Sequence, residues 1–195
     1  MAYRSGTYIA FHADGTSDPT ESDMKYYRLV EAWKNNEDLE IKFVNSHDKA
    51  NAVRDTSLRT TLEQSILERL RNSKNLLLII GDTTKNDRDW IPFEISKAID
   101  IYHLAIVAVY PGYRYIFPEY YAPANFRPLW PPALATRIDN NTARVIHIPF
   151  RKEPVGAAIN QFGVNNQTPN TSLDYYISEE YVKWNLFNPL TDRTR

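Results

Sequence analysis

The chain has 195 residues, of which 43% are hydrophobic and 13% aromatic, so it is long enough to form one domain with a substantial core. Its net charge is −1 and its Lys and Arg residues are scattered, which gives no electrostatic footprint for nucleic acid or an anionic membrane. The absence of cysteine excludes disulfides, thiol catalysis and thiolate metal sites.

The N-terminal residues do not resemble a targeting segment. They lead directly into an apolar strand-like segment without the longer apolar region of a signal peptide, and no stretch approaches the ~18 apolar residues of a membrane span. We therefore expect a cytoplasmic protein with neither a nucleic acid nor a membrane among its partners.

Five short apolar segments are predicted to form strands. They lie at residues 7–11, 41–44, 76–80, 104–110 and 144–148. The third is an unbroken apolar run from Leu76 to Ile80, closed by Gly81, which is typical of a parallel strand buried on both faces. Helical segments alternate with these strands, so the sequence predicts an α/β fold with a parallel sheet, helices on both faces and right-handed crossovers.

Helices are expected where apolar residues recur at three- and four-residue spacing. Ser22 or Asp23 can cap the first helix, whose expected core-facing residues are Tyr26, Leu29, Val30 and Trp33. The second helix is expected to present Leu58, Leu62, Ile66, Leu67 and Leu70. The third, with Pro92 at its first position, is expected to present Ile95, Ala98, Ile99 and Tyr102.

Residues 111–142 interrupt this alternation. They hold six of the twelve prolines amid seven aromatic residues, and such side chains would not remain solvated, so we expect an ordered insertion packed on the body. A short helix is expected at 153–161. An Asn-rich linker at 165–171 then precedes a last helix that is predicted to close the core, with a dimer or partner surface as the alternative. Its expected buried face consists of Ile177, Tyr181 and Trp184.

Glu94 is the candidate for chemistry. The sequence contains no dinucleotide fingerprint, P-loop or G-x-S-x-G motif, and its four histidines lack H-x-x-x-H spacing, so no metal site is expected. A phospho-receiver domain is set aside because the acidic pair after strand one and the lysine after strand five are missing. With Pro92 at the first helical position, Glu94 is at the third, where a glutamate caps its own helix. Spacing alone favours that capping role over catalysis.

A family resemblance changes this balance. The segments Tyr8-Ile9-Ala10-Phe11-His12 and Leu78-Ile79-Ile80-Gly81, followed by Thr84 and by Trp90-x-x-x-Glu94-Ile95, resemble the TIR-like family, and most closely the bacterial TIR-like proteins of Thoeris-type anti-phage defence. The resemblance covers roughly residues 5–110. It implies a flavodoxin-like, five-stranded parallel sheet in the order 2-1-3-4-5. We expect a TIR-like domain over 1–162, with the insertion at 111–142, and a linker with a C-terminal helical extension over 163–195.

The resemblance also implies an activity. Enzymes of this family cleave NAD at the nicotinamide–ribose bond, with NAD as substrate and no cofactor, and some join the ADP-ribose to itself to give a cyclic signal that activates an effector. Glu94 matches the catalytic glutamate. Hydrolysis and cyclisation both remain open, and the chain is a candidate for homo-oligomer formation. The alternatives are a TIR-like module that assembles with itself or an effector without turnover, and a domain that binds a nucleotide signal.

The remaining site residues follow from the strand order. In a 2-1-3-4-5 sheet the topological switch point lies between strands one and three, so Phe11-His12 and Gly81-Asp82 are expected to flank one crevice. Phe11 is expected to stack on the nicotinamide and Trp90 to wall the pocket. The alternatives are that Trp90 only packs and that His12 is an ordinary surface residue. Asp82 and Thr83 could likewise only form the turn. The expected substrate-binding residues are Phe11, His12, Asp14, Asp48, Asn51, Asp82, Thr83 and Trp90.

Overall fold

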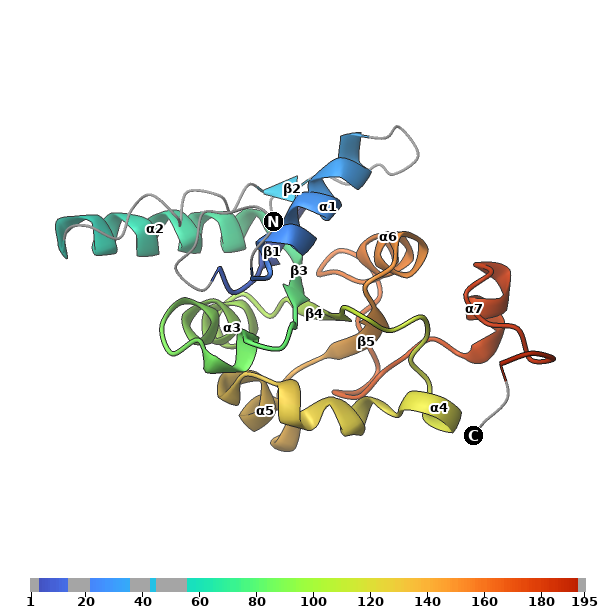
Figure 1. Cartoon of the computed structure of the whole chain (residues 1–195). Coiled ribbons are helices and arrows are strands. Elements are labelled where there is room, and N and C mark those ends of the chain that lie inside the picture. The colour runs from blue at the N-terminus through green and yellow to red at the C-terminus, as the bar shows by residue number, and fades with distance from the viewer. Residues whose placement is uncertain (1–3, 14–21, 36–42, 45–55, 193–195) are drawn as a thin grey trace.

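A parallel sheet forms the centre of the molecule (Figure 1). The computed structural model describes residues 4–13, 22–35, 43–44 and 56–192. Its strands are β1 (Gly6–Ala10), β2 (Phe43–Val44), β3 (Ser73–Ile79), β4 (Ala105–Tyr110) and β5 (Val145–Pro149). They lie in the order β2-β1-β3-β4-β5, and every neighbouring pair is parallel. The predicted α/β class with a parallel sheet is confirmed.

Helices cover both faces of the sheet (Figure 1). One face is covered by α2 (Thr56–Asn72), α3 (Trp90–Asp100) and α5 (Pro132–Asp139). The other is covered by α1 (Met24–Asn35), α6 (Lys152–Gln161) and α7 (Ser178–Lys183). The shorter elements are η2 (Thr84–Asn86), α4 (Pro118–Tyr121) and η3 (Pro123–Leu129). Of the helices in the described ranges, none is long and apolar enough to cross a membrane.

Successive strand residues point into opposite halves of the core. In β1, Tyr8 and Ala10 belong to the half under α2, α3 and α5, whereas Ile9 belongs to the half under α1, α6 and α7. Both halves exclude water, and every residue from Leu76 to Ile80 is at most 1% exposed. This two-sided burial explains why β3 is an unbroken apolar run without alternating polar residues.

The buried faces of two helices differ from the prediction. In α1, Val30 is buried and Tyr26 and Trp33 are half-buried against the core, as predicted, whereas Leu29 is 47% exposed. Met24 and Tyr27, which the prediction did not include, complete the buried face at three-residue spacing with Val30. The stacking of Tyr27 on Phe11 of the adjoining strand segment sets this rotation of the helix, which local periodicity did not reveal. Near the C-terminus, Ile177 precedes α7 and is 56% exposed, so it does not share the buried face.

The segment 111–142 is ordered and packed on the body, as predicted. Phe126 and Trp130 are buried in the core half that includes α3 and α5. Arg137 of α5 forms an ion pair with Asp100 at the end of α3, which joins these neighbouring helices.

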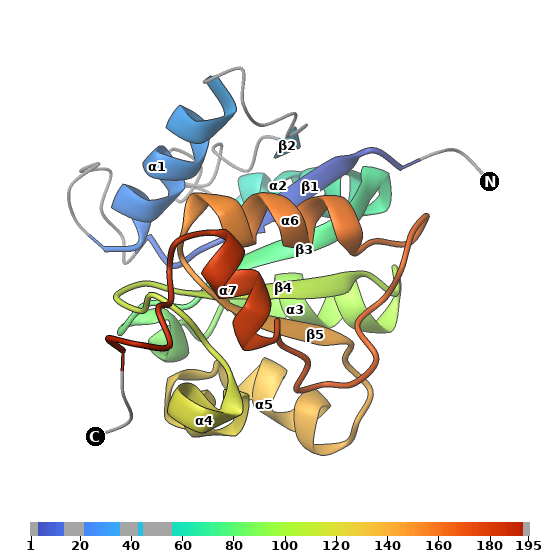
Figure 2. The same ribbon diagram turned by 90° about the vertical axis from the view of Figure 1, so that its right-hand side faces the viewer.

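The C-terminal residues complete both the sheet edge and the core. Segment 171–174 runs along the outer edge of β5, where the His147 N–H donates to the Asp174 carbonyl at 2.8 Å. In Figure 2, α7 lies over the face that α6 also covers, and Tyr181 is fully buried, as predicted for a helix that closes the core. Phe187 then packs edge-on against Phe117 and Tyr120.

A chain of buried hydrogen bonds connects the segment 111–142 to the C-terminal residues. The Trp130 Nε1–H donates to the Tyr110 hydroxyl at 2.8 Å, and that hydroxyl lies 2.7 Å from Nδ1 of His147. His147 Nε2 lies 3.1 Å from the Ser172 carbonyl, which only accepts hydrogen bonds. These partners assign the proton to Nε2 and make Nδ1 the acceptor. Burial lowers the pKa of His147 to about 4, so the ring is neutral in the folded protein.

This depressed pKa predicts a specific loss of stability in acid. The unfolded protein binds a proton at His147 below about pH 6.5, while the folded protein resists it until about pH 4. Stability therefore falls as the pH drops through this window, by about 2 to 3 kcal/mol between pH 7 and pH 4.5 from this residue alone. Urea unfolding of wild type and His147→Gln at both pH values isolates the contribution, because glutamine does not titrate. Equal pH dependence in the two proteins would contradict the assignment.

Candidate functional site

The helix that carries Glu94 begins earlier than the sequence predicted. Helix α3 starts at Trp90, and its first turn is closed by the Phe93 N–H donating to the Asp89 carbonyl at 3.3 Å. Pro92 is thus the third helical residue. Its missing N–H costs no helical hydrogen bond, because the first N–H groups of a helix have no intrahelical acceptor. Glu94 becomes the fifth residue, so the predicted helix-capping position was wrong. Trp90 and Glu94, four residues apart, are neighbours on the surface of this helix.

Glu94 lies in the interior, against the first strand. Its exposed fraction is 0%, and the Tyr8 hydroxyl of β1, also 0% exposed, donates to Glu94 Oε1 at 2.5 Å. Burial, and then the negative charge of Glu94, raise the pKa of Tyr8 well above its usual value. Tyr8 therefore stays protonated and remains a hydrogen-bond donor to the carboxylate across the physiological pH range.

A second polar cluster fills the space between the carboxyl ends of β1 and β3. Asp23, just before α1, accepts a hydrogen bond from the Thr84 hydroxyl at 2.6 Å, and Thr84 Oγ1 accepts one from the Gly81 N–H at 2.8 Å. The Asp23 N–H donates to the His12 carbonyl at 3.3 Å. The His12 ring in turn lies 3.0 Å from Asp87. Residues from three separate parts of the chain therefore meet at the end of the sheet where the sequence predicted a crevice.

Gly81 is required by the close approach of Asp23. A Cβ atom at position 81 would lie 1.9 Å from Asp23 Oδ1, which is far inside the contact distance. Asp23 is only 3% exposed, and burial raises the pKa of its carboxyl group, while the hydrogen bond from Thr84 acts in the opposite direction. The turn after β3 thus packs closely around the carboxyl group of the residue that directly precedes α1.

Trp90 lies at the junction of α2 and α3. The guanidinium group of Arg59 lies 5.1 Å from the centre of the Trp90 ring, a cation–π distance. Arg59 also donates to both carboxylate oxygens of Asp89, at 2.7 and 3.3 Å, and to Glu63 at 3.0 Å. Phe93 packs edge-on against Trp90 with ring centres 6.2 Å apart. These contacts join α2 to the start of α3, the helix that carries Glu94.

The structure does not bring Phe11 and Glu94 together. The Phe11 ring lies in the core half on the other side of the sheet, stacked on Tyr27 with centres 4.8 Å apart and 4% exposed. His12, one residue further on, reaches the turn after β3 through Asp87.

The other predicted substrate-binding residues lie at the same end of the sheet or outside the described residues. Asp82 is exposed and Thr83 half-buried, and both directly precede η2. Asp14, Asp48 and Asn51 lie outside the described residues. Their binding roles stay predictions.

Sequence reasoning missed the partners of the site rather than its centre. Tyr8 carried one usable signal, since a phenol within an apolar, buried strand requires a hydrogen-bond partner. Asp23 was considered only as a helix cap, and nothing local indicated that its side chain reaches Thr84, 61 residues away.

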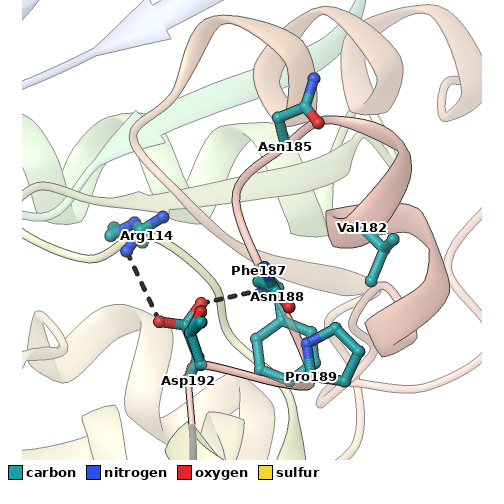
Figure 3. A pocket seen from close by; sticks show the side chains of 8 residues that line it. Arg114, Val182, Asn185, Phe187, Asn188, Pro189 and Asp192 are labelled. Atoms are coloured by element: carbon teal, nitrogen blue, oxygen red, sulfur yellow. Dashed lines mark hydrogen bonds and ion pairs between the residues drawn. The ribbon is translucent and has the colours of Figure 1, made fainter.

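A separate cavity of about 490 Å³ lies in the C-terminal segment (Figure 3). Its lining consists of Arg114, Val182, Asn185, Phe187, Asn188, Pro189, Thr191 and Asp192. Asp192 lies 3.8 Å from Arg114 and accepts a hydrogen bond from the Asn188 N–H at 2.9 Å. Of the predicted site residues that the structure describes, none lines this cavity. Within the ranges that the structure describes, no three His, Asp or Glu side chains are grouped so as to hold a metal ion.

Comparison with known families shows what the first half of the chain is similar to. The model of a family described as "Thoeris protein ThsB, TIR-like domain" matches residues 8–115, which is 108 of the 195 residues. The matched range includes Tyr8, Trp90 and Glu94, and it ends within the segment 111–142.

The polar cluster at the ends of β1 and β3 predicts that Thr84 is important for stability. Thr84→Val keeps the side-chain shape but removes the hydroxyl that serves both Asp23 and Gly81, so we expect a loss of about 2 to 4 kcal/mol in the free energy of unfolding. Thr136→Val, on the exposed surface of α5, is the matched control and should change it by less than about 0.5 kcal/mol. Equal urea midpoints for the two variants would show that the cluster contributes little.

Proposed function

We propose, because the chain belongs to the Thoeris ThsB TIR-like family, that it cleaves the nicotinamide–ribose bond of NAD with Glu94 as the catalytic carboxylate. Family membership implies a role in anti-phage defence. In the proposed role, NAD is a substrate and the product is a cyclic ADP-ribose-type nucleotide that activates a separate effector. We count the short β2 as the edge strand of a TIR-like 2-1-3-4-5 sheet. We also propose that the enzyme acts in the cytoplasm.

The chemistry requires only one carboxylate at the reacting sugar. When the bond between the ribose C1′ and the pyridinium nitrogen breaks, its electron pair passes to the nitrogen and nicotinamide leaves as a neutral molecule, so no acid is needed. The ribose is left with oxocarbenium character, which an adjacent negative charge stabilises. C1′ is then captured by water, which gives ADP-ribose and a proton, or by a nucleophilic atom of the same molecule, which gives the cyclic product.

The buried position of Glu94 beside Tyr8 is the observation that carries the proposal. A negative charge interacts with a cationic transition state more strongly in a low-dielectric interior than in water. Glu94 is 0% exposed, so the form that holds NAD must differ from this structure around the carboxylate. A glutamate with only a structural function at the start of a helix would be expected at the surface, where water solvates it.

The substrate-binding roles extend the proposal to the surroundings of Glu94. Trp90 is proposed to wall the pocket and His12 to hold the ribose or a phosphate. The other proposed substrate-binding residues are Asp14, Asp48, Asn51, Asp82 and Thr83. Stacking of Phe11 on nicotinamide requires its ring to leave Tyr27, so this part of the proposal depends on rearrangement. We also propose that 1–162 forms the catalytic domain and that 163–195 is its extension.

The proposal predicts that Glu94→Gln abolishes NAD cleavage. Glutamine preserves size and hydrogen bonding but removes the charge, so we expect turnover to fall by about 100-fold or more. The assay follows NAD loss and nicotinamide release by chromatography, and the mass of the second product separates ADP-ribose from its cyclised form. Glu153→Gln, on the exposed surface of α6, is the control and should retain wild-type turnover.

The assay needs both the purified protein and extracts of phage-infected cells. Release of nicotinamide by wild type and Glu153→Gln, but not by Glu94→Gln, supports the proposal. Equal, negligible turnover by all three proteins in both settings would overturn the catalytic assignment and favour a TIR-like interaction module.

A further inference from the structure

Tyr8 and Glu94 form a buried pair that connects the first strand to the helix after the third strand. The two residues are 86 positions apart, both are 0% exposed, and the hydroxyl-to-carboxylate distance is 2.5 Å. Hydrogen bonds to charged groups are shorter and stronger than those between neutral groups. Tyr8 also lies within the sheet, where β1 is paired to β3 and β2 in register, so its hydroxyl is held at a fixed height above the strand.

We propose that Tyr8 is the positioning residue of Glu94, holding the carboxylate in its reactive orientation and keeping it ionised. The inference rests on the proposed function of Glu94. Tyr8 acts through Glu94 and does not itself contact the reacting atoms. A glutamate side chain has three rotatable bonds, and a hydrogen bond to one oxygen removes most of that freedom. The carboxylate then needs no reorganisation when positive charge develops on the ribose.

The electrostatics of the pair keep the Tyr8 phenol in its protonated form, in which it can donate to Glu94. Burial disfavours the phenolate, and the charge of Glu94 disfavours it further, so Tyr8 remains a donor. A donor to the ionised carboxylate lowers its proton affinity. Among the described residues, Arg69 of α2 also acts on Tyr8, and its positive charge lowers the pKa of that phenol, opposite to the effect of Glu94. Loss of the Tyr8 hydroxyl therefore shifts Glu94 toward its protonated, inactive form.

Tyr110 provides a matched control for a purely structural effect. It is likewise a fully buried tyrosine in the same half of the core, and its hydroxyl is hydrogen-bonded at 2.7 Å to His147 instead of to Glu94. Tyr8→Phe and Tyr110→Phe each remove one buried hydroxyl from a strand of the same sheet. A difference in catalysis between them therefore reports on the Tyr8–Glu94 contact and not on general destabilisation.

The test combines kinetics with a direct titration of Glu94. We expect Tyr8→Phe to lower kcat about ten- to hundredfold at pH 7 with KM changed less than about twofold, and to move the acid limb of the kcat profile up by about one pH unit. Carbon-13 NMR of the glutamate carboxyl groups, with the Glu94 signal identified by its absence in Glu94→Gln, should show the same shift in Glu94 titration. Tyr110→Phe should change none of these quantities.

A second substitution at position 8 distinguishes a folding defect from the loss of the hydrogen bond. Difluorotyrosine introduced at position 8 by nonsense suppression keeps the ring and hydroxyl but makes the hydroxyl a stronger donor, so the acid limb and the NMR titration should move to lower pH. The role of Tyr8 alone would be overturned if Glu94→Gln loses turnover while Tyr8→Phe keeps both the wild-type turnover and the wild-type NMR titration of Glu94. Full turnover in Glu94→Gln would overturn the proposed function and with it the role of Tyr8 in catalysis.

Discussion

The hydrogen bond between Tyr8 and Glu94 is the constraint on which the site depends. A carboxylate with no exposed surface has lost its hydration, and a protein tolerates it only when nearby donors or positive charges replace the water. The donor comes from β1, so Glu94 keeps its place only if α3 starts at the correct residue and packs at the correct height on the sheet. The contacts at the start of α3 lie outside the site, but they therefore also affect the position of Glu94.

Two further networks of buried polar side chains connect the elements that surround this pair. At the carboxyl ends of β1 and β3, Asp23 and Thr84 join the beginning of α1 to the turn after β3, and only a glycine at position 81 leaves room for them. At the other edge of the sheet, His147 receives its partners from β4 and from the C-terminal segment. In both places a buried hydrogen bond joins segments that are far apart in the sequence.

Local sequence patterns identified the strands, and the family resemblance identified Glu94, but neither revealed the contacts between them. The run from Leu76 to Ile80 predicted its strand because burial on both faces leaves no position for a polar residue. The start of α3 was misplaced because Pro92 is tolerated at the third helical position as well as the first. The face on which Phe11 lies, and the partner of Tyr8, depend on side chains that only the tertiary structure brings together, so the periodicity of one element gave no information about them.

The central claim is that NAD reacts at Glu94, and the structure of the Glu94→Gln variant with NAD tests it most directly. The variant should bind NAD without consuming it, which preserves the complex for crystallography. The account predicts that the nicotinamide ribose lies against residue 94, near Tyr8 and the start of α3, with the surrounding side chains moved to admit it. NAD bound elsewhere, for example in the cavity beside Arg114 and Asp192, with residue 94 still enclosed, would contradict it.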